Sequence, residues 1–324
     1  MSLTNKEVYK KTLGFSIRQL IWDIISIIIF VVISGVGFVI AESTLNKGLI
    51  GLGIGVVIGG IVLAIISRYI SYSYKAGQIA MMTKGVTGDN LEGDVVGEGK
   101  RIVKERFATV AAYFAVTGVI KSIFNQLGKA ITSVGQSIGG DTGSAVGGTI
   151  SSVINTIVAY LCDCCLGWVF YRKDVKASKA TCEGAVLFFK HGKTLIKNLG
   201  RVFGLGAGSF ILIGGLFFGI SYAIMSCFPD AFSGLSREII EAGSRLGREL
   251  PAWVSDVNVL TMVSAGILSV ILWSIIHSTF VRPFVLVGVL RNYIDSGKDD
   301  IPSEESFAEL DKKSDKFKKL HSEL

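Results

Sequence analysis

The chain has 324 residues, of which 50% are hydrophobic and 18% charged, and its mean hydropathy is +0.54. Soluble domains usually carry about a quarter charged residues, so this composition argues against a soluble globular protein. The formal net charge of +7 does not require a nucleic-acid partner. Positively charged loops on the inner side of a membrane explain it, and no nucleic acid is expected to bind.

Six apolar segments are predicted to cross a membrane as helices, which makes the fold class an all-α polytopic membrane protein. Each reaches about 20 residues, the length that spans a bilayer, except that Lys121 interrupts the third. They cover residues 20–41, 48–68, 107–127, 144–165, 202–228 and 257–281. No signal-peptide cleavage site follows the first segment, which is therefore expected to be a span. Residues 1–294 form the predicted membrane domain and residues 295–324 a charged cytoplasmic tail.

The distribution of lysine and arginine predicts the orientation of the chain. When loops are assigned alternately from the inside, 27 of these residues lie inside and 5 outside, with Lys121 inside the third segment. Both termini are therefore expected in the cytoplasm. The chain also contains no Asn-x-Ser/Thr glycosylation acceptor, which fits a plasma membrane of the bacterial inner-membrane type.

The third and fourth segments leave two topologies open. Basic residues at 100–106 and 171–179 should both face the cytoplasm, so an even number of crossings lies between them. Segments 107–127 and 144–165 therefore either both cross, or form a re-entrant hairpin between four other crossings. In both cases residues 139–143, GGDTG, form the predicted turn at the tip.

Glycine residues recur at intervals of four in several of these regions, including the pairs Gly204/Gly208 and Gly215/Gly219 of the fifth segment. The longer rows are Gly135, Gly139, Gly143 and Gly147 in the hairpin, and Gly51, Gly55 and Gly59 in the second segment. Small residues at this spacing let helix backbones approach closely, so we expect helix packing and a homo-oligomer. An alternative interpretation of the hairpin row is a flexible, partly polar lining of a transport pathway.

Two segments outside the spans are predicted to be interfacial amphipathic helices. Residues 177–200 carry lysines opposite an apolar side, which suits an anionic inner leaflet, although this segment could also be the stem of the next span. Residues 231–250 repeat apolar side chains at helical spacing before Pro251 and would cap the outer face.

The tail has an apolar stripe at heptad-like spacing, interrupted by two polar members. Its members are Phe307, Leu310, Ser314, Phe317, His321 and Leu324. We expect a short amphipathic helix that docks on the cytoplasmic face, on a neighbouring subunit or on a cytoplasmic protein that binds Phe307–Leu324. A solvated tail is the alternative.

Polar residues at membrane depth are candidates for a transport pathway. We select Lys121, Asn155 and Asp163. The alternative is that ionisable residues near span ends, including His277, simply reach the interface. The cysteines around Asp163 resemble buried small hydrophobes more than a metal site, because paired C-x2-C ligands are missing. No metal and no cofactor are predicted.

No catalytic motif of a known type is present: there is no G-x-S-x-G, no Walker A sequence and no H-E-x-x-H. No catalytic residue is therefore predicted, and the protein is not expected to be an enzyme. A lipid-acting enzyme is the weakest of the alternatives.

Residues 159–216 show an ordered set of features: YLCDCCLGW, then ATCEGAVLFFKHGKTLIKN, then a basic residue that leads into a glycine-rich span. This order resembles the C-terminal half of choline transporter-like proteins. The likeness covers under a fifth of the chain, its spacing differs, and the large extracellular domain and extra spans of that family are missing. The resemblance implies transport of a small cation, and no binding residues are carried over from it.

These observations predict an integral membrane channel or transporter subunit that moves an ion or small solute. The alternative is a non-conducting membrane scaffold or accessory protein that recruits a cytoplasmic partner through its basic loops and C-terminal helix.

Overall fold

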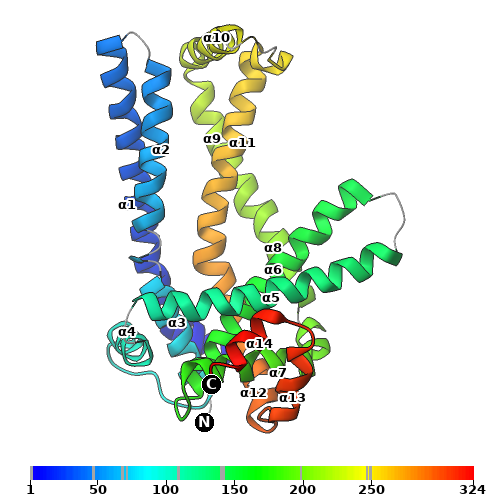
Figure 1. Ribbon diagram of the computed structural model, residues 1–324. Helices are drawn as coiled ribbons and strands as arrows, with labels where there is room; N and C mark the ends of the chain where they lie inside the picture. The colour runs from blue at the N-terminus through cyan, green and yellow to red at the C-terminus, as the bar shows by residue number, and fades with distance from the viewer. Residues whose placement is uncertain are drawn as a thin grey trace. The chain divides into compact units, whose positions relative to one another are not determined.

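The computed structural model describes residues 3–45, 48–66, 69–70, 72–107, 110–138, 143–197, 199–245, 247 and 250–324. Every regular element in these ranges is helical, which confirms the predicted all-α class (Figure 1). Within the same ranges, three helices are long and apolar enough to cross a membrane: Asn5–Leu45, Gly204–Ser226 and Val257–Lys298. The chain divides into unit 1, residues 1–19, 69–202 and 282–324, and unit 2, residues 20–68 and 203–281.

In unit 2, the first helical hairpin is built on glycine. Helix α1 (Asn5–Leu45) enters this unit at residue 20 and turns back into α2 (Gly48–Ile66). A Cβ atom added to Gly55 would lie 2.8 Å from Ser34 Cα and 2.9 Å from Ile33 O, so the two backbones touch. A Cβ on Gly59 would lie 3.1 Å from the Phe30 ring. The row Gly51, Gly55 and Gly59 thus faces α1, as close packing requires.

The hairpin row of glycines cannot be described in the same way. Gly139 lies outside the residues that the structure describes, as do residues 140–142 of the predicted turn. Gly135, Gly143 and Gly147 lie in helices, but their surroundings are also outside the description. Close packing at these positions therefore stays a prediction.

A second helical pair of unit 2 consists of two apolar helices joined by an amphipathic one. The first runs through α8 (Leu199–Ser209), the π-helix η2 (Phe210–Gly214) and α9 (Gly215–Ser226). Helix α10 (Pro229–Arg245) and the 3₁₀ turn η3 (Ala252–Val254) lead into α11 (Val257–Ile276) and the π-helix η4 (His277–Val281). The Asp256 carboxylate accepts the backbone N–H groups of Asn258 and Val259 and so caps α11.

Unit 1 packs the first part of α1, up to residue 19, and eight further described helices around large aromatic side chains. The eight are α3 (Tyr72–Val86), α4 (Val95–Arg106), α5 (Val110–Ile138), α6 (Gly143–Tyr171), α7 (Ala177–Lys197), α12 (Arg282–Lys298), α13 (Glu304–Asp311) and α14 (Asp315–His321). Trp168 of α6 and Tyr293 of α12 are the largest fully buried side chains. The fourth predicted span thus ends inside a protein core rather than at a lipid surface.

Helix α7 differs from the predicted interfacial helix. Residues 180–188 are all buried, including Thr181 and Glu183, because α6, α12, α5 and the tail helices pack around them. Glu183 is held by the Trp168 indole N–H at 3.1 Å and by Arg172 at 2.9 Å. Burial raises the pKa of Glu183, and these two donors oppose the rise. The apolar side of residues 180–188 is therefore covered by protein, not by a leaflet.

The predicted tail stripe lies against α5 and α7, and it forms two short helices instead of one (Figure 1, red). Phe307, Leu310 and Phe317 are at most 2% exposed and pack on Ile123, Cys182 and the neighbouring alanine and valine of α7. The chain breaks between α13 and α14 because the Ser314 hydroxyl accepts the Phe317 N–H and begins a new helix.

The polar members of the stripe fix the position of the tail. The Ser314 hydroxyl also donates to Gln126 Oε1 on α5 at 2.8 Å. His321 contacts Asp311 and Glu304, and only Leu324 is exposed. The two polar members of the stripe, Ser314 and His321, are therefore satisfied by hydrogen bonds within the folded tail and its neighbour α5.

Candidate functional site

Asp163 lies at the centre of a buried ion triad in unit 1. Its carboxylate binds Lys75 Nζ of α3 at 2.9 Å and Arg282 Nη2 of α12. The same guanidinium donates to the Ala159 carbonyl at 3.0 Å and lies over the Tyr160 ring, 5.4 Å from its centroid. The Asp163 side chain is only 6% exposed, whereas that of Lys75 is 41% exposed.

This geometry gives Asp163 a full set of partners. A buried carboxylate costs several kcal/mol of desolvation unless opposite charge and hydrogen bonds compensate it, and here two cations do so. Arg282 Nε is buried and makes no hydrogen bond to any residue that the structure describes. The triad therefore joins α3, α6 and α12, which are distant in the sequence, through one carboxylate.

The other two predicted pathway residues do not join this triad. Lys121 is exposed on α5, and the structure pairs Asp163 with Lys75 and Arg282 instead. Asn155 lies on α6, but its side chain is outside the described part of the chain. Sequence reasoning selected Asp163 and missed both of its partners.

The cysteines near Asp163 are free thiols within the packed core. Cys164, Cys165 and Cys182 are buried, and the Cys165 thiol contacts the Thr181 carbonyl at 3.7 Å. Burial raises the pKa of Cys182 to about 12, so this thiol stays protonated at neutral pH and is a poor metal ligand. Over the ranges described, no three His, Cys, Asp or Glu side chains come together as metal ligands would.

A second polar cluster lies in unit 2, between two of the membrane-length helices. The Trp273 indole N–H of α11 donates to the Ser209 hydroxyl at the end of α8, at 3.2 Å. The Trp273 ring also contacts Phe210 edge-on, with centroids 5.0 Å apart, and His277, with centroids 5.1 Å apart. Gly206 faces His277, because a Cβ added there would lie 3.8 Å from Nε2.

Both helices change to π-helical geometry at this cluster. Segment η2 begins at Phe210, directly after Ser209, and η4 begins at His277. A π turn lengthens the hydrogen-bonded ring by one residue, shifts the side chains that follow it, and is found often at functional sites. Phe210 of η2 and His277 of η4 both contact the Trp273 ring, so the two π turns lie at the same cluster of side chains.

The π turns have no sequence signature that could have revealed them. His277 was recognised only as an ionisable residue near the end of a span. Ser209 and Trp273 could have been found as hydrogen-bonding side chains within otherwise apolar runs, but their pairing depends on how the two helices pack.

Comparison with known proteins gives no relative. No protein-family model, no curated protein and no solved structure matches this chain.

Proposed function

We propose that this chain is an integral membrane channel or transporter subunit that moves an ion or small solute. One observation carries the proposal: two apolar helices long enough to cross a membrane both turn π-helical where Ser209, Trp273 and His277 meet. Ionisable residues and interrupted helices at membrane depth are typical of transport proteins. The resemblance of residues 159–216 to choline transporter-like proteins also favours a small cation as cargo.

The proposed topology has four crossings: residues 20–41, α2, α8–α9 and α11. Helices α5 and α6 then form a hairpin that does not cross, which replaces the six crossings predicted from the sequence with the four-crossing alternative. Two contacts support this choice. On α5, Gln126 hydrogen-bonds the charged tail, and on α6, Asp163 binds two cations of unit 1. Both termini are then cytoplasmic, and 29 lysines and arginines lie inside against 4 outside.

Epitope tags test this topology in intact cells. A tag after Lys47 should be reachable from outside, whereas a tag after Gly140 should be reachable only after lysis. Labelling of both tags in intact cells would instead support six crossings. We propose the plasma membrane of a bacterial inner-membrane type as the location, because anionic inner-leaflet lipids suit the basic cytoplasmic segments.

We further propose that the subunit assembles as a homo-oligomer through the α8–α9 helix. Gly204, Gly208, Gly215 and Gly219 would each meet no atom within 4 Å if a Cβ were added. This row leaves a flat surface on a membrane-length helix, which is the kind of surface that close helix pairing uses. Cysteine cross-linking at Gly208 should give a dimer if the row faces a second copy.

The scaffold function receives less support. In its recruiting segment, residues 307–324, the side chains of Phe307, Leu310 and Phe317 are covered by α5 and α7 of the same chain. A cytoplasmic partner would have to displace the tail before it could bind the aromatic residues.

Flux in liposomes tests the transport proposal. Purified protein is reconstituted, and uptake of potassium and of choline is measured beside Trp273→Phe, which keeps the ring and loses the donor to Ser209. We expect this variant to reduce flux severalfold, and Ser209→Ala to reproduce the loss. The matched control is Trp253→Phe on η3, which should keep native flux. Absence of flux for both cations would overturn the proposal in favour of a scaffold.

A further inference from the structure

Unit 1 contains a cavity of about 200 Å³ that neither the ion triad nor the π turns use. It lies where the end of α3, the middle of α4 and the end of α6 meet. Its polar lining comes from Thr83, Lys84, Thr87, Asp89, Tyr171 and Lys173. Phe170 and Ile102 supply apolar wall. A cavity with a few converging polar groups on an apolar wall is the usual form of a small-molecule site.

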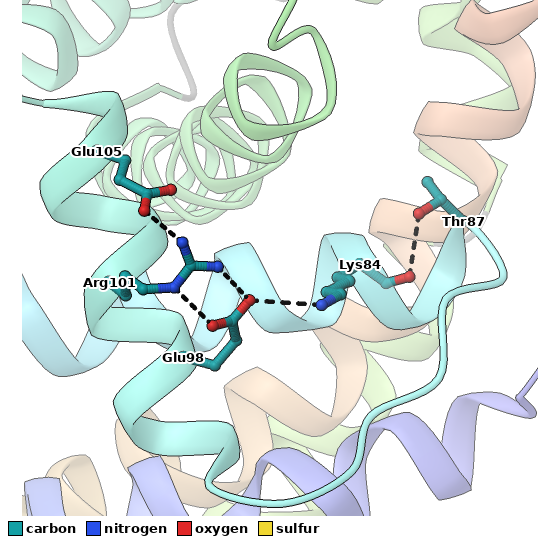
Figure 2. Close-up of polar contacts among 5 residues, drawn as sticks. All are labelled: Lys84, Thr87, Glu98, Arg101 and Glu105. Carbon is teal, nitrogen blue, oxygen red and sulfur yellow. Dashed lines mark hydrogen bonds and ion pairs between the residues drawn. The ribbon is translucent and has the colours of Figure 1, made fainter.

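Lys84 retains donor capacity at this cavity. Its Nζ pairs with Glu98 Oε1 at 3.5 Å, at the limit of a hydrogen bond, whereas Arg101 holds both oxygens of Glu98 at 2.8 and 2.9 Å (Figure 2). The hydrogen bonds from Arg101, with smaller contributions from its charge and from Lys84, lower the pKa of Glu98 to about 2. Because Glu98 is bound mainly by Arg101, the Lys84 ammonium group can donate to a ligand.

Lys173 supplies a second cation to the same cavity. It follows the last residues of α6, next to Phe170 and Tyr171 of the wall. Across the ranges that the structure describes, no carboxylate lies within ion-pair distance of Lys173, unlike its neighbour Arg172, which binds Asp174 and Glu183. Two lysine residues therefore line one small cavity.

The hydrogen-bond acceptors that line the cavity do not favour the binding of a cation. The carbonyl groups of Thr83 and Lys84, at the end of α3, already accept the Thr87 hydroxyl at 3.0 Å and the amides of Thr87 and Asp89 at 3.1 Å. Among the described lining residues, only Asp89 contributes negative charge, and it is exposed, as is Lys173. The ionisable lining thus carries two positive charges against one negative charge.

We propose that this cavity binds the phosphate group of a phosphate monoester, with Lys84 and Lys173 as its ligands. Charge-assisted hydrogen bonds from ammonium groups to phosphate oxygens are among the strong polar contacts of proteins. The volume leaves room for a small organic group beside the aromatic wall. The monoester is either a soluble metabolite or the headgroup of a phosphorylated lipid.

Isothermal titration of the full-length protein in detergent tests the proposal. The probes are inorganic phosphate, glycerol 3-phosphate and a short-chain phosphatidylinositol 4-phosphate. Lys84→Met and Lys173→Met should each weaken binding about tenfold, the scale of one charge-assisted hydrogen bond. Asp89→Asn should strengthen it severalfold, because it removes the opposing charge. Preference for the lipid probe over glycerol 3-phosphate identifies the headgroup as the source, and the reverse identifies a metabolite.

The control is Lys100→Met on α4, whose ammonium group lies over the Tyr74 ring, 4.1 Å from its centroid, and which does not line the cavity. It should leave binding unchanged. Circular dichroism verifies that each variant is folded. The proposal is overturned if none of the three probes binds. It is also overturned if Asp89→Asn weakens binding, or if Lys100→Met has the same effect as the cavity lysines.

Discussion

Replacing Asp163 with asparagine should lower the stability of the helix packing in unit 1. The native carboxylate binds Lys75 at 2.9 Å and also pairs with Arg282, so the variant leaves the guanidinium without its anion. Removal of one partner from a buried ion pair costs about 3–5 kcal/mol. The Arg282 side chain is 24% exposed, which places the expected loss near the lower end, about 3 kcal/mol.

Hydrogen exchange measured by mass spectrometry reports this loss at the helices concerned. A loss of about 3 kcal/mol predicts amide exchange about 100-fold faster in the second half of α6 and in α12. Lys75→Met is the matched control. Since its ammonium group is 41% exposed, the change should cost less than about 1 kcal/mol.

Asp163→Leu combined with Arg282→Met removes both charges and should restore most of the native protection. Unchanged exchange in Asp163→Asn, together with altered ion selectivity in liposomes, would refute the structural role. It would assign Asp163 to a transport pathway, as the sequence first indicated.

Three further perturbations address the tail and the first hairpin. The hydrogen bond to Asp311 raises the pKa of His321, so protonation favours the packing of α14 on α13 within the tail. This stabilisation is complete below about pH 6 and is lost as the pH rises through the raised pKa. Limited proteolysis of the tail should therefore be faster at about pH 9 than at about pH 6, and His321→Gln should remove the difference. Phe317→Ala should cost about 3–5 kcal/mol of tail docking, because the ring is fully buried, and α14 should then lose exchange protection at every pH. Gly51→Leu should separate α1 from α2 and lower the midpoint of thermal unfolding, because its Cβ would collide with Gly37. Gly53→Leu is the control and should not lower the midpoint, because a Cβ at Gly53 meets no atom within 4 Å. Equal effects of the two substitutions would contradict the close packing of α1 on α2.

Local pattern predicted the helices and the stripe of the tail. The long uncharged runs indicated apolar helices, and the spacing of Phe307, Leu310, Ser314 and Phe317 marked the face that is buried against α5 and α7. The apolar runs and the stripe both depend on residues within a few helical turns of one another, so they can be recognised in the sequence before the fold is known.

Pattern alone could not decide what covers an apolar face. Residues 177–200 have the amphipathic pattern of a helix at a lipid surface, yet residues 180–188 of α7 are enclosed by other helices of unit 1. A helix that packs on a lipid surface and a helix that packs on a protein core need the same spacing of apolar residues. The buried Glu183, with Trp168 and Arg172 as partners, distinguishes the two, and those partners come from α6 and from the residue that follows it.

The sequence by itself determined that this is an all-helical protein with membrane-length apolar helices and a tail that has one apolar face. Only the tertiary structure decided which charges meet and where the helices deform. Asp163 pairs with Arg282, 119 residues away, and Ser209 meets Trp273 across a helix contact. Periodicity constrains residues that are close in the chain, whereas pairing of distant side chains and π turns depend on how whole helices pack.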